Sequence, residues 1–141
     1  MSFFSFQNNR QQYRSFCEQQ KLLPVFLNDW WLDAVCGEEK WSAFFVEKGP
    51  KTAAVMPFYF RKKHGVTFLT TPDFTPFSGI WIDYPDGQKP VTKASFRVEM
   101  QKKIIEQLPL FGHFEVRFPK GDNYVLPFHW AGFQLQTRYT Y

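Results

Sequence analysis

The sequence contains few of the residues on which metal sites and disulfide frameworks depend. It has two cysteines and three histidines in 141 residues. Cys17 and Cys36 lie far apart and match no disulfide or zinc-binding spacing, so we expect both to be reduced and helical in a cytoplasmic protein. His64, His113 and His129 are scattered, with no second His or Cys at ligand spacing. A metal site is therefore not expected.

Familiar catalytic and phosphate-binding motifs are also missing. Ser78 has no glycine two residues before it, so it is not the serine of a G-x-S-x-G elbow. Neither G-x-x-x-x-G-K-[ST] nor G-x-G-x-x-G occurs, which disfavours a nucleotide held by such a loop. No apolar run approaches the roughly 20 residues that span a bilayer, and the N-terminus lacks the features of a signal peptide. No transmembrane segment is expected.

Aromatic residues, in contrast, are abundant. The chain is 44% hydrophobic and 21% aromatic, with eighteen phenylalanines, and its net charge is +4. This composition predicts a dense core in a single domain spanning 1–141. The weak positive charge does not indicate a DNA-binding protein, and an RNA-binding module is disfavoured because the aromatics fall mostly at core-like positions.

The hydrophobic patterns predict helices and strands in a mixed order. Expected helices cover 8–21, 30–36 and, after a cap at Thr92, a segment to about Leu108. Expected strands cover 41–47, 52–61, 66–71, 80–82, 114–118 and 133–141, with a turn at 126–132 before the last of them. This order predicts an α/β (α+β) domain whose sheet is largely antiparallel and flanked by helices.

Residues with special backbone preferences mark the ends of several of these elements. Pro24 ends the first helix, Asn28 or Asp29 caps the second, and Gly37 terminates it. A hairpin turn is expected at 62–65 because Gly65 tolerates a positive φ. The basic run at 61–64 is best explained as a solvated hairpin tip, with contact to the phosphates of RNA or of a cofactor as the alternative.

The loop at 70–79 is the most informative connection. It combines two prolines, a glycine, several hydroxyl groups and two aromatic side chains directly after a strand. Rigid loops of this kind often form ligand-binding walls. A purely structural crossover is the favoured interpretation, and a ligand wall is the alternative.

Several segments together resemble a known family. They are Asn28 to Gly37, Met56 to Tyr59, Thr71 to Gly79, Leu126 to Phe133, and Arg138 to Tyr141. In this order they resemble the N-terminal half of FemAB-like, GNAT-related bacterial acyltransferases, and the resemblance covers nearly the whole chain. It implies a GNAT-like fold and one subdomain of a two-subdomain N-acyltransferase that moves an acyl or aminoacyl group to an amine.

The resemblance also implies how the work is divided between the subdomains. Acetyl-CoA or another acyl donor would be bound mainly by a missing second half, in agreement with the absence of the Q/R-x-x-G-x-G/A pyrophosphate loop. The chain alone would be incomplete or inactive. Its partner would be a second GNAT-like subdomain or a second copy, and its acceptor a small molecule or a peptidoglycan precursor. No general base is assigned; the candidate substrate contacts are Tyr59, Asp73, Thr75, Phe77 and Ser78.

Two other functions remain open. The aromatic strand expected at 133–141 would need sheet neighbours, so the chain could be a non-catalytic interaction module that pairs through this strand. A free-standing small acetyltransferase is the other alternative, although it would need a phosphate-binding loop. We expect the end at Tyr141 either to tuck into the sheet or to continue into a further segment.

Overall fold

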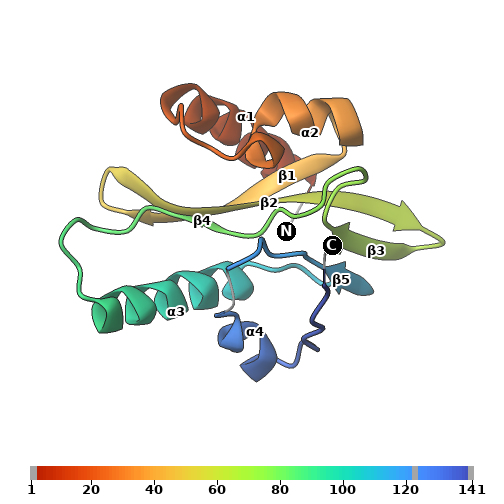
Figure 1. The fold of residues 1–141 in the computed structure, drawn as a ribbon. Coiled ribbons are helices and arrows are strands. Elements are labelled where there is room, and N and C mark those ends of the chain that lie inside the picture. The colour runs from red at the N-terminus through yellow and green to blue at the C-terminus, as the bar shows by residue number, and fades with distance from the viewer. Residues whose placement is uncertain (1–2, 122–123, 140–141) are drawn as a thin grey trace.

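The computed structural model describes residues 3–121 and 124–139. Figure 1 shows α1 and α2 on one face of the sheet and α3 and α4 on the other. This arrangement confirms the α+β class with helices that flank a mostly antiparallel sheet. In chain order the elements are α1 (Phe3–Gln19), η1 (Val25–Leu27), α2 (Asp29–Cys36), β1 (Trp41–Lys48), β2 (Lys51–Lys63), β3 (Val66–Thr70), β4 (Trp81–Ile82), α3 (Pro90–Glu106), β5 (His113–Glu115) and α4 (Leu126–Trp130).

The sheet has the strand order β1-β2-β3-β5, and the short β4 pairs with the first half of β2. The pairs β1–β2, β2–β3 and β2–β4 are antiparallel, whereas β3 and β5 are parallel. A parallel pair needs a long crossover, and here the chain between β3 and β5 contains α3. The carboxyl ends of β3 and β5 therefore meet at one edge of the molecule.

The predicted hairpin at 62–65 is confirmed. Lys63 pairs with Val66, which leaves His64 and Gly65 as a two-residue loop. Both loop residues have positive φ, 51° and 77°. These values are typical of a type I′ turn, whose twist matches that of the flanking strands.

Both faces of β1 and β2 are largely buried over residues 41–46 and 53–58, because helices cover each side of the sheet there (Figure 1). On the side of α1 and α2, Trp41 packs beneath Tyr13, with ring centroids 5.7 Å apart. On the side of α3 and α4, Phe44 stacks on Phe58 at 4.5 Å, and Ile104 of α3 joins the same cluster. The sheet thus separates two hydrophobic clusters.

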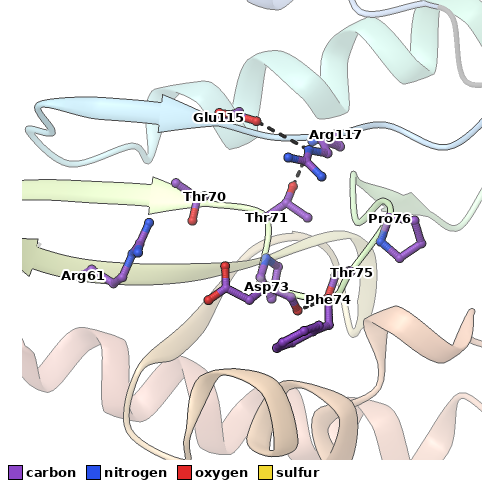
Figure 2. A pocket seen from close by; sticks show the side chains of 10 residues that line it. Arg61, Thr70, Thr71, Asp73, Phe74, Thr75, Pro76, Glu115 and Arg117 are labelled. Atoms are coloured by element: carbon purple, nitrogen blue, oxygen red, sulfur yellow. Dashed lines mark hydrogen bonds and ion pairs between the residues drawn. The ribbon is translucent and has the colours of Figure 1, made fainter. Parts of the chain in front are cut away.

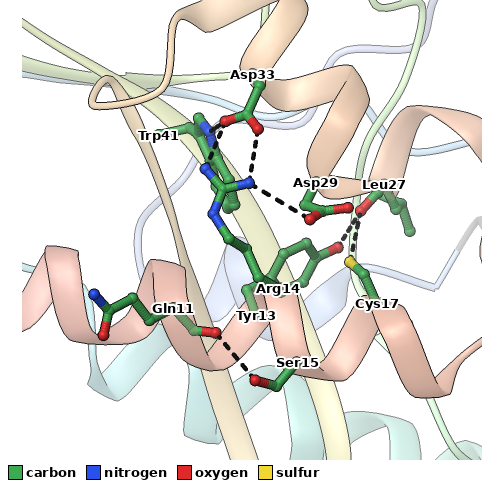
Figure 3. Close-up of polar contacts among 9 residues, drawn as sticks. All are labelled: Gln11, Tyr13, Arg14, Ser15, Cys17, Leu27, Asp29, Asp33 and Trp41. Carbon is green, nitrogen blue, oxygen red and sulfur yellow. Dashed lines mark hydrogen bonds and ion pairs between the residues drawn. The ribbon is translucent and has the colours of Figure 1, made fainter.

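A polar network ties α1 to α2 and β1, as Figure 3 shows. The Arg14 guanidinium donates two hydrogen bonds to the Asp33 carboxylate, at 2.7 and 2.8 Å, and lies 3.5 Å from Asp29. Trp41 donates its indole N–H to the same Asp33 carboxylate at 2.9 Å. The hydrogen bonds from Arg14 hold the pKa of Asp33 below its usual value.

The outer edge of β1 is covered by side chains instead of another strand. Three alternate carbonyl groups of β1 accept hydrogen bonds from α1 and from the residue after α3: Trp41 from Arg10 at 3.1 Å, Ala43 from Asn9 at 3.0 Å, and Phe45 from Gln107 at 2.7 Å. Side-chain donors of this kind protect an edge from pairing with another chain. β1 is therefore the closed edge of the sheet.

Two helices differ from their expected bounds. α1 begins at Phe3, not at residue 8, because Phe6 extends its apolar stripe and packs on Phe58 at 5.4 Å. α3 begins at Pro90, so Thr92 lies inside the helix and is not its cap. Proline is well suited to a first helical turn, since its missing N–H has no intrahelical partner there. None of the helices within the described ranges is long and apolar enough to cross a membrane.

The cap expected for α2 is confirmed in position. Asn28 is the N-cap residue, although its side chain makes no capping hydrogen bond, and Gly37 ends the helix with a φ of 89°. The Asn28 amide instead donates to the carbonyl of Pro24 at 3.1 Å. The N-cap position therefore follows the sequence, while the capping bond does not.

The region after α3 differs most from expectation. β5 ends at Glu115, not at residue 118, because the backbone of Arg117 bonds to the loop after β3. The predicted turn at 126–132 contains α4, which buries Phe128. The predicted strand at 133–141 is absent over 133–139, and residues 140–141 lie outside the described part.

A physical reason for this missing strand is visible at its start. Phe133 turns into the core, where its ring lies 4.9 Å from Phe114 and 5.9 Å from Phe111. Beyond it, Leu135 is 49% and Tyr139 85% exposed, so the rest of the apolar face finds no surface to bury. The adjacent β5 is only three residues long and offers a short edge for pairing.

Gly112 marks the closest approach between the start of β5 and the hairpin. A Cβ at this position would lie 2.1 Å from Cγ1 of Val66, while the Gly112 N–H donates to Thr67 at 2.8 Å. We expect Gly112→Ala to lower the free energy of unfolding by about 1–2 kcal/mol, measured by urea denaturation. The cost should shrink in a Val66→Ala background, where the clashing methyl group is gone. An equal cost in both backgrounds would contradict this contact.

Candidate functional site

The loop after β3 lies at the carboxyl ends of the parallel pair. In the register of this pair, Thr70 aligns with Glu115 at the last position. The loop continues the pairing, because the Thr71 N–H donates to the Glu115 carbonyl at 2.9 Å and the Thr71 hydroxyl accepts the Arg117 N–H at 2.9 Å. The Ser78 N–H in turn donates to the Arg117 carbonyl at 2.9 Å. Ligands of sheets with parallel strands bind preferentially outside such carboxyl ends.

A pocket of about 580 Å³ lies between this loop and the end of β5. That volume is within the range of small-ligand sites, roughly 300–1,000 Å³. Figure 2 shows Glu115 and Arg117 on one side of Thr71, and Asp73 and Phe74 on the other. The pocket is lined by Arg61, Thr70, Thr71, Pro72, Asp73, Phe74, Thr75, Pro76, Glu115 and Arg117.

The four charged groups of the pocket differ in how strongly they are already paired. Glu115 has two cationic neighbours, Arg117 at 3.5 Å and Arg138 at 4.0 Å, and the ring of His113 lies 3.7 Å away. Arg61 makes no ion pair within the described residues; its guanidinium lies over the ring of Tyr59 at 5.2 Å. Asp73 is exposed, and its carboxylate likewise has no ion-pair partner among the described residues. One cation and one anion are therefore available to a ligand.

Two predicted contacts, Thr75 and Ser78, are buried supports of the loop. The Thr75 hydroxyl accepts the indole N–H of Trp31 at 2.9 Å and donates to the carbonyl of Asp73 at 3.1 Å. The Ser78 hydroxyl lies 3.2 Å from that of Thr71. These bonds fasten the loop to α2 and to its own first residue, which makes the wall of the pocket rigid.

Phe74 has an unusual combination of backbone and side-chain properties. Its φ is +57°, a region that non-glycine residues seldom occupy, and its side chain is 88% exposed. The cost of this conformation is on the order of 1–3 kcal/mol, and burial of the ring does not offset it. Such strain often occurs where a side chain is held ready for a ligand.

The predicted contacts divide between the pocket and its surroundings. Asp73 and Thr75 line the pocket, whereas Tyr59, Phe77 and Ser78 do not. Tyr59 lies beneath the Arg61 guanidinium, and Phe77 packs against the ring of Phe26 at 5.2 Å. The assignment of these residues as substrate contacts stays a prediction.

The predicted contacts leave out eight lining residues: Arg61, Thr70, Thr71, Pro72, Phe74, Pro76, Glu115 and Arg117. In the sequence, Arg61 stands out only as part of the basic run at 61–64, and Phe74 only as one of the two aromatic residues of the loop. Glu115 and Arg117 are two residues apart in a strand-like segment and therefore share a face. That spacing was the available signal, but the sequence does not indicate that β5 lies beside β3.

Neither cysteine is prepared to act as a nucleophile. Burial raises the pKa of Cys17 to about 11. Burial, with a smaller contribution from Asp73, raises the pKa of Cys36 to about 12. Both thiols are therefore protonated at neutral pH, whereas a reactive cysteine is a thiolate. Within residues 3–121 and 124–139, no three His, Cys, Asp or Glu side chains are grouped closely enough to hold a metal ion.

A scan against models of known protein families finds no match, and a search of curated proteins also finds none. A search of solved structures finds a similarity to an aminoglycoside acetyltransferase, meta-AAC0020, from an uncultured soil metagenomic sample, in complex with sisomicin. The TM-score is 0.42 and the identity 12%, over 99% of this chain and 88% of that chain. A likeness this weak carries no argument about the activity or the substrate of the present chain.

Proposed function

We propose that the chain is a GNAT-like subdomain of a FemAB-like N-acyltransferase and that its loop pocket receives the amine acceptor. The observation that carries this proposal is the position of the pocket, about 580 Å³ in volume, at the carboxyl ends of β3 and β5. Its wall belongs to Thr71 to Gly79, one of the segments on which the family resemblance rests. The α+β architecture supports the same assignment.

The chemistry required of this pocket is orientation of the acceptor. In N-acyl transfer the amine nitrogen attacks the acyl carbonyl, an amide bond forms, and the donor's thiol or alcohol leaves while the nitrogen gives up a proton. Asp73 offers carboxylate oxygens to an ammonium group, and Glu115 holds Arg117 at 3.5 Å on the other side of the pocket. The loop's hydrogen bonds to α2 and to Arg117 hold these groups in a fixed geometry.

The chain is suited to binding the acceptor, but it lacks the features that would bind the acyl donor. A pyrophosphate at a helix N-terminus needs free backbone N–H groups. The first turn of α3 contains Pro90, which has no N–H, and no glycine-rich loop precedes it. We therefore propose that acetyl-CoA or another acyl donor binds mainly to a second GNAT-like subdomain or a second copy, and that the chain alone is inactive. In this proposal the complex is cytoplasmic, and its acceptor is a small molecule or a peptidoglycan precursor.

The interaction-module alternative has less support. It depends on a strand at 133–141 that would pair with another chain. Residues 133–139 form no strand, and Phe133 is anchored against Phe114. The acceptor-binding function is therefore the better supported of the two.

Ligand binding to the isolated chain tests the proposal. We expect 2-phenylethylamine, used as a simple amine probe, to shift the backbone NMR signals of residues 70–76 and 115–117. Saturating acetyl-CoA should leave the unfolding midpoint unchanged. A donor at about 100 times its dissociation constant would instead add roughly 2.7 kcal/mol and raise the midpoint by roughly 5–10 °C. That rise would identify a free-standing acetyltransferase. If the amine does not shift the NMR signals of the pocket residues, the proposed acceptor site is wrong.

A further inference from the structure

We infer that the pocket selects a ligand carrying both an ammonium group and a carboxylate, with an apolar or aromatic group beside them: an α-amino acid or the end of a peptide. This inference rests on the proposed acceptor function and narrows its substrate class. It follows from three features of the pocket, namely its charge balance, the two unpaired charges, and the exposed ring of Phe74.

The balance of positive and negative side chains in the pocket disfavours ligands that carry several charges of the same sign. The lining has two arginines, Arg61 and Arg117, and two carboxylates, Asp73 and Glu115. A ligand with several positive charges would meet both guanidinium groups, and one with several negative charges would meet both carboxylates. Selection against such like-charge contacts is as effective as attraction in setting specificity. A ligand with one charge of each sign matches the lining.

The pairing of these groups shows which of them remain for the ligand. Glu115 is surrounded by His113, Arg117 and Arg138 within 4.0 Å. Arg61, by contrast, rests on the rings of Tyr59 and Phe68 at 5.2 and 6.0 Å, contacts that leave its edge free for a carboxylate. Asp73 is the corresponding free carboxylate for an ammonium group. Both line the same pocket.

Phe74 supplies the third element of recognition. Phe74 is 88% exposed at the pocket and is next in sequence to Asp73, and Pro72 and Pro76 also line the pocket. A ring held there by a strained backbone offers a flat apolar surface to a ligand side chain. The ammonium contact and the apolar contact thus come from adjacent residues, which favours a ligand whose amine and side chain share one carbon.

Three matched probes test this inference: L-phenylalanine, 2-phenylethylamine, which lacks the carboxylate, and 3-phenylpropionate, which lacks the amine. Affinities are measured by NMR titration of the full chain. We expect L-phenylalanine to bind at least about threefold more tightly than either analogue, with shifts at residues 70–76 and 115–117. Each missing charged contact at an exposed site accounts for about that factor.

Substitutions assign the contacts. Arg61→Gln should reduce the affinity for the two probes that carry a carboxylate, L-phenylalanine and 3-phenylpropionate, about three- to tenfold. Asp73→Asn should reduce the affinity for the two probes that carry an amine, L-phenylalanine and 2-phenylethylamine, by a similar factor. Phe74→Ala should reduce the affinity for L-phenylalanine but leave the affinity for L-alanine unchanged. Lys62→Gln and Asp86→Asn, both exposed and outside the pocket lining, are matched controls. All these side chains are exposed, so circular dichroism should confirm that every variant folds.

The outcomes separate this inference from the proposed function. If 2-phenylethylamine binds as tightly as L-phenylalanine, the amine-acceptor site stands and selection of an amino acid is overturned. If 3-phenylpropionate binds as tightly, the amine is not recognised and both proposals fall. If no probe shifts the pocket signals, both fall as well.

Discussion

Phe44→Ala is expected to lower the free energy of unfolding by about 3–5 kcal/mol. The Phe44 side chain is fully buried, at 0% exposure, and stacks on Phe58 at 4.5 Å beneath α3. Its removal leaves a cavity between the sheet and the helix that the surrounding strands cannot close. Because domains are stable by only about 5–15 kcal/mol, the loss is a large fraction of the total. Thermal unfolding should show a midpoint roughly 10–20 °C lower.

The matched control for this prediction is Phe74→Ala. It removes the same atoms from a side chain that is 88% exposed, so the stability should change by less than about 0.5 kcal/mol. Equal effects of the two substitutions, measured by urea denaturation of both variants, would contradict the placement of Phe44 in the core.

Asp33→Ala is expected to lower the free energy of unfolding by about 2–3 kcal/mol at neutral pH. The substitution leaves the Arg14 guanidinium with Asp29 alone, at 3.5 Å, and removes the acceptor of the Trp41 indole N–H. Breaking a fully buried ion pair costs about 3–5 kcal/mol. The effect here is smaller because the Arg14 and Asp33 side chains keep exposures of 34% and 25%, and solvent screens the charges.

The pH dependence of this loss identifies its cause. The hydrogen bonds from Arg14 lower the pKa of Asp33 in the folded protein below the value of about 3.9 in an unfolded chain. Its ionised form therefore stabilises the fold fully above about pH 4, and this contribution falls as the pH drops through the folded pKa. The stability difference between wild type and Asp33→Ala should shrink below pH 4.

Urea denaturation of both proteins between pH 7 and pH 3 measures this trend. Asp86→Ala, at an exposed turn, serves as the control and should cost less than about 0.5 kcal/mol throughout. A constant difference between wild type and Asp33→Ala at all pH values would show that packing, not the ionised carboxylate, is responsible.

The candidate site was predictable only in its central segment. The prolines, glycine and aromatic residues of the loop at 70–79 indicated a candidate ligand-binding wall, and two of its predicted contacts, Asp73 and Thr75, line the pocket. Ser78 and Phe77 belong to the same loop, but they face its supports: the hydroxyl of Thr71 and the ring of Phe26. The sequence marks a rigid loop but does not indicate which of its side chains point inward.

The opposite wall could not be predicted. Glu115 and Arg117 reach the pocket because β5 pairs in parallel with β3, across a connection that contains α3. Arg61 reaches it from the end of β2, where the rings of Tyr59 and Phe68 support the guanidinium. Such contacts join residues distant in the chain, and the sequence carries no local record of them.

The sequence by itself determined the approximate positions of helices α2 and α3, the His64–Gly65 turn, the α+β class and the proline-containing loop at 70–79. These features depend on interactions between near neighbours: capping positions, a positive φ at glycine, and hydrophobic periodicity. Tertiary structure decided the parallel pairing of β3 with β5, the short β5, and the absence of a strand over 133–139. An alternating segment becomes a strand only where an edge of sufficient length is free to pair with it, and that depends on how every other element has packed.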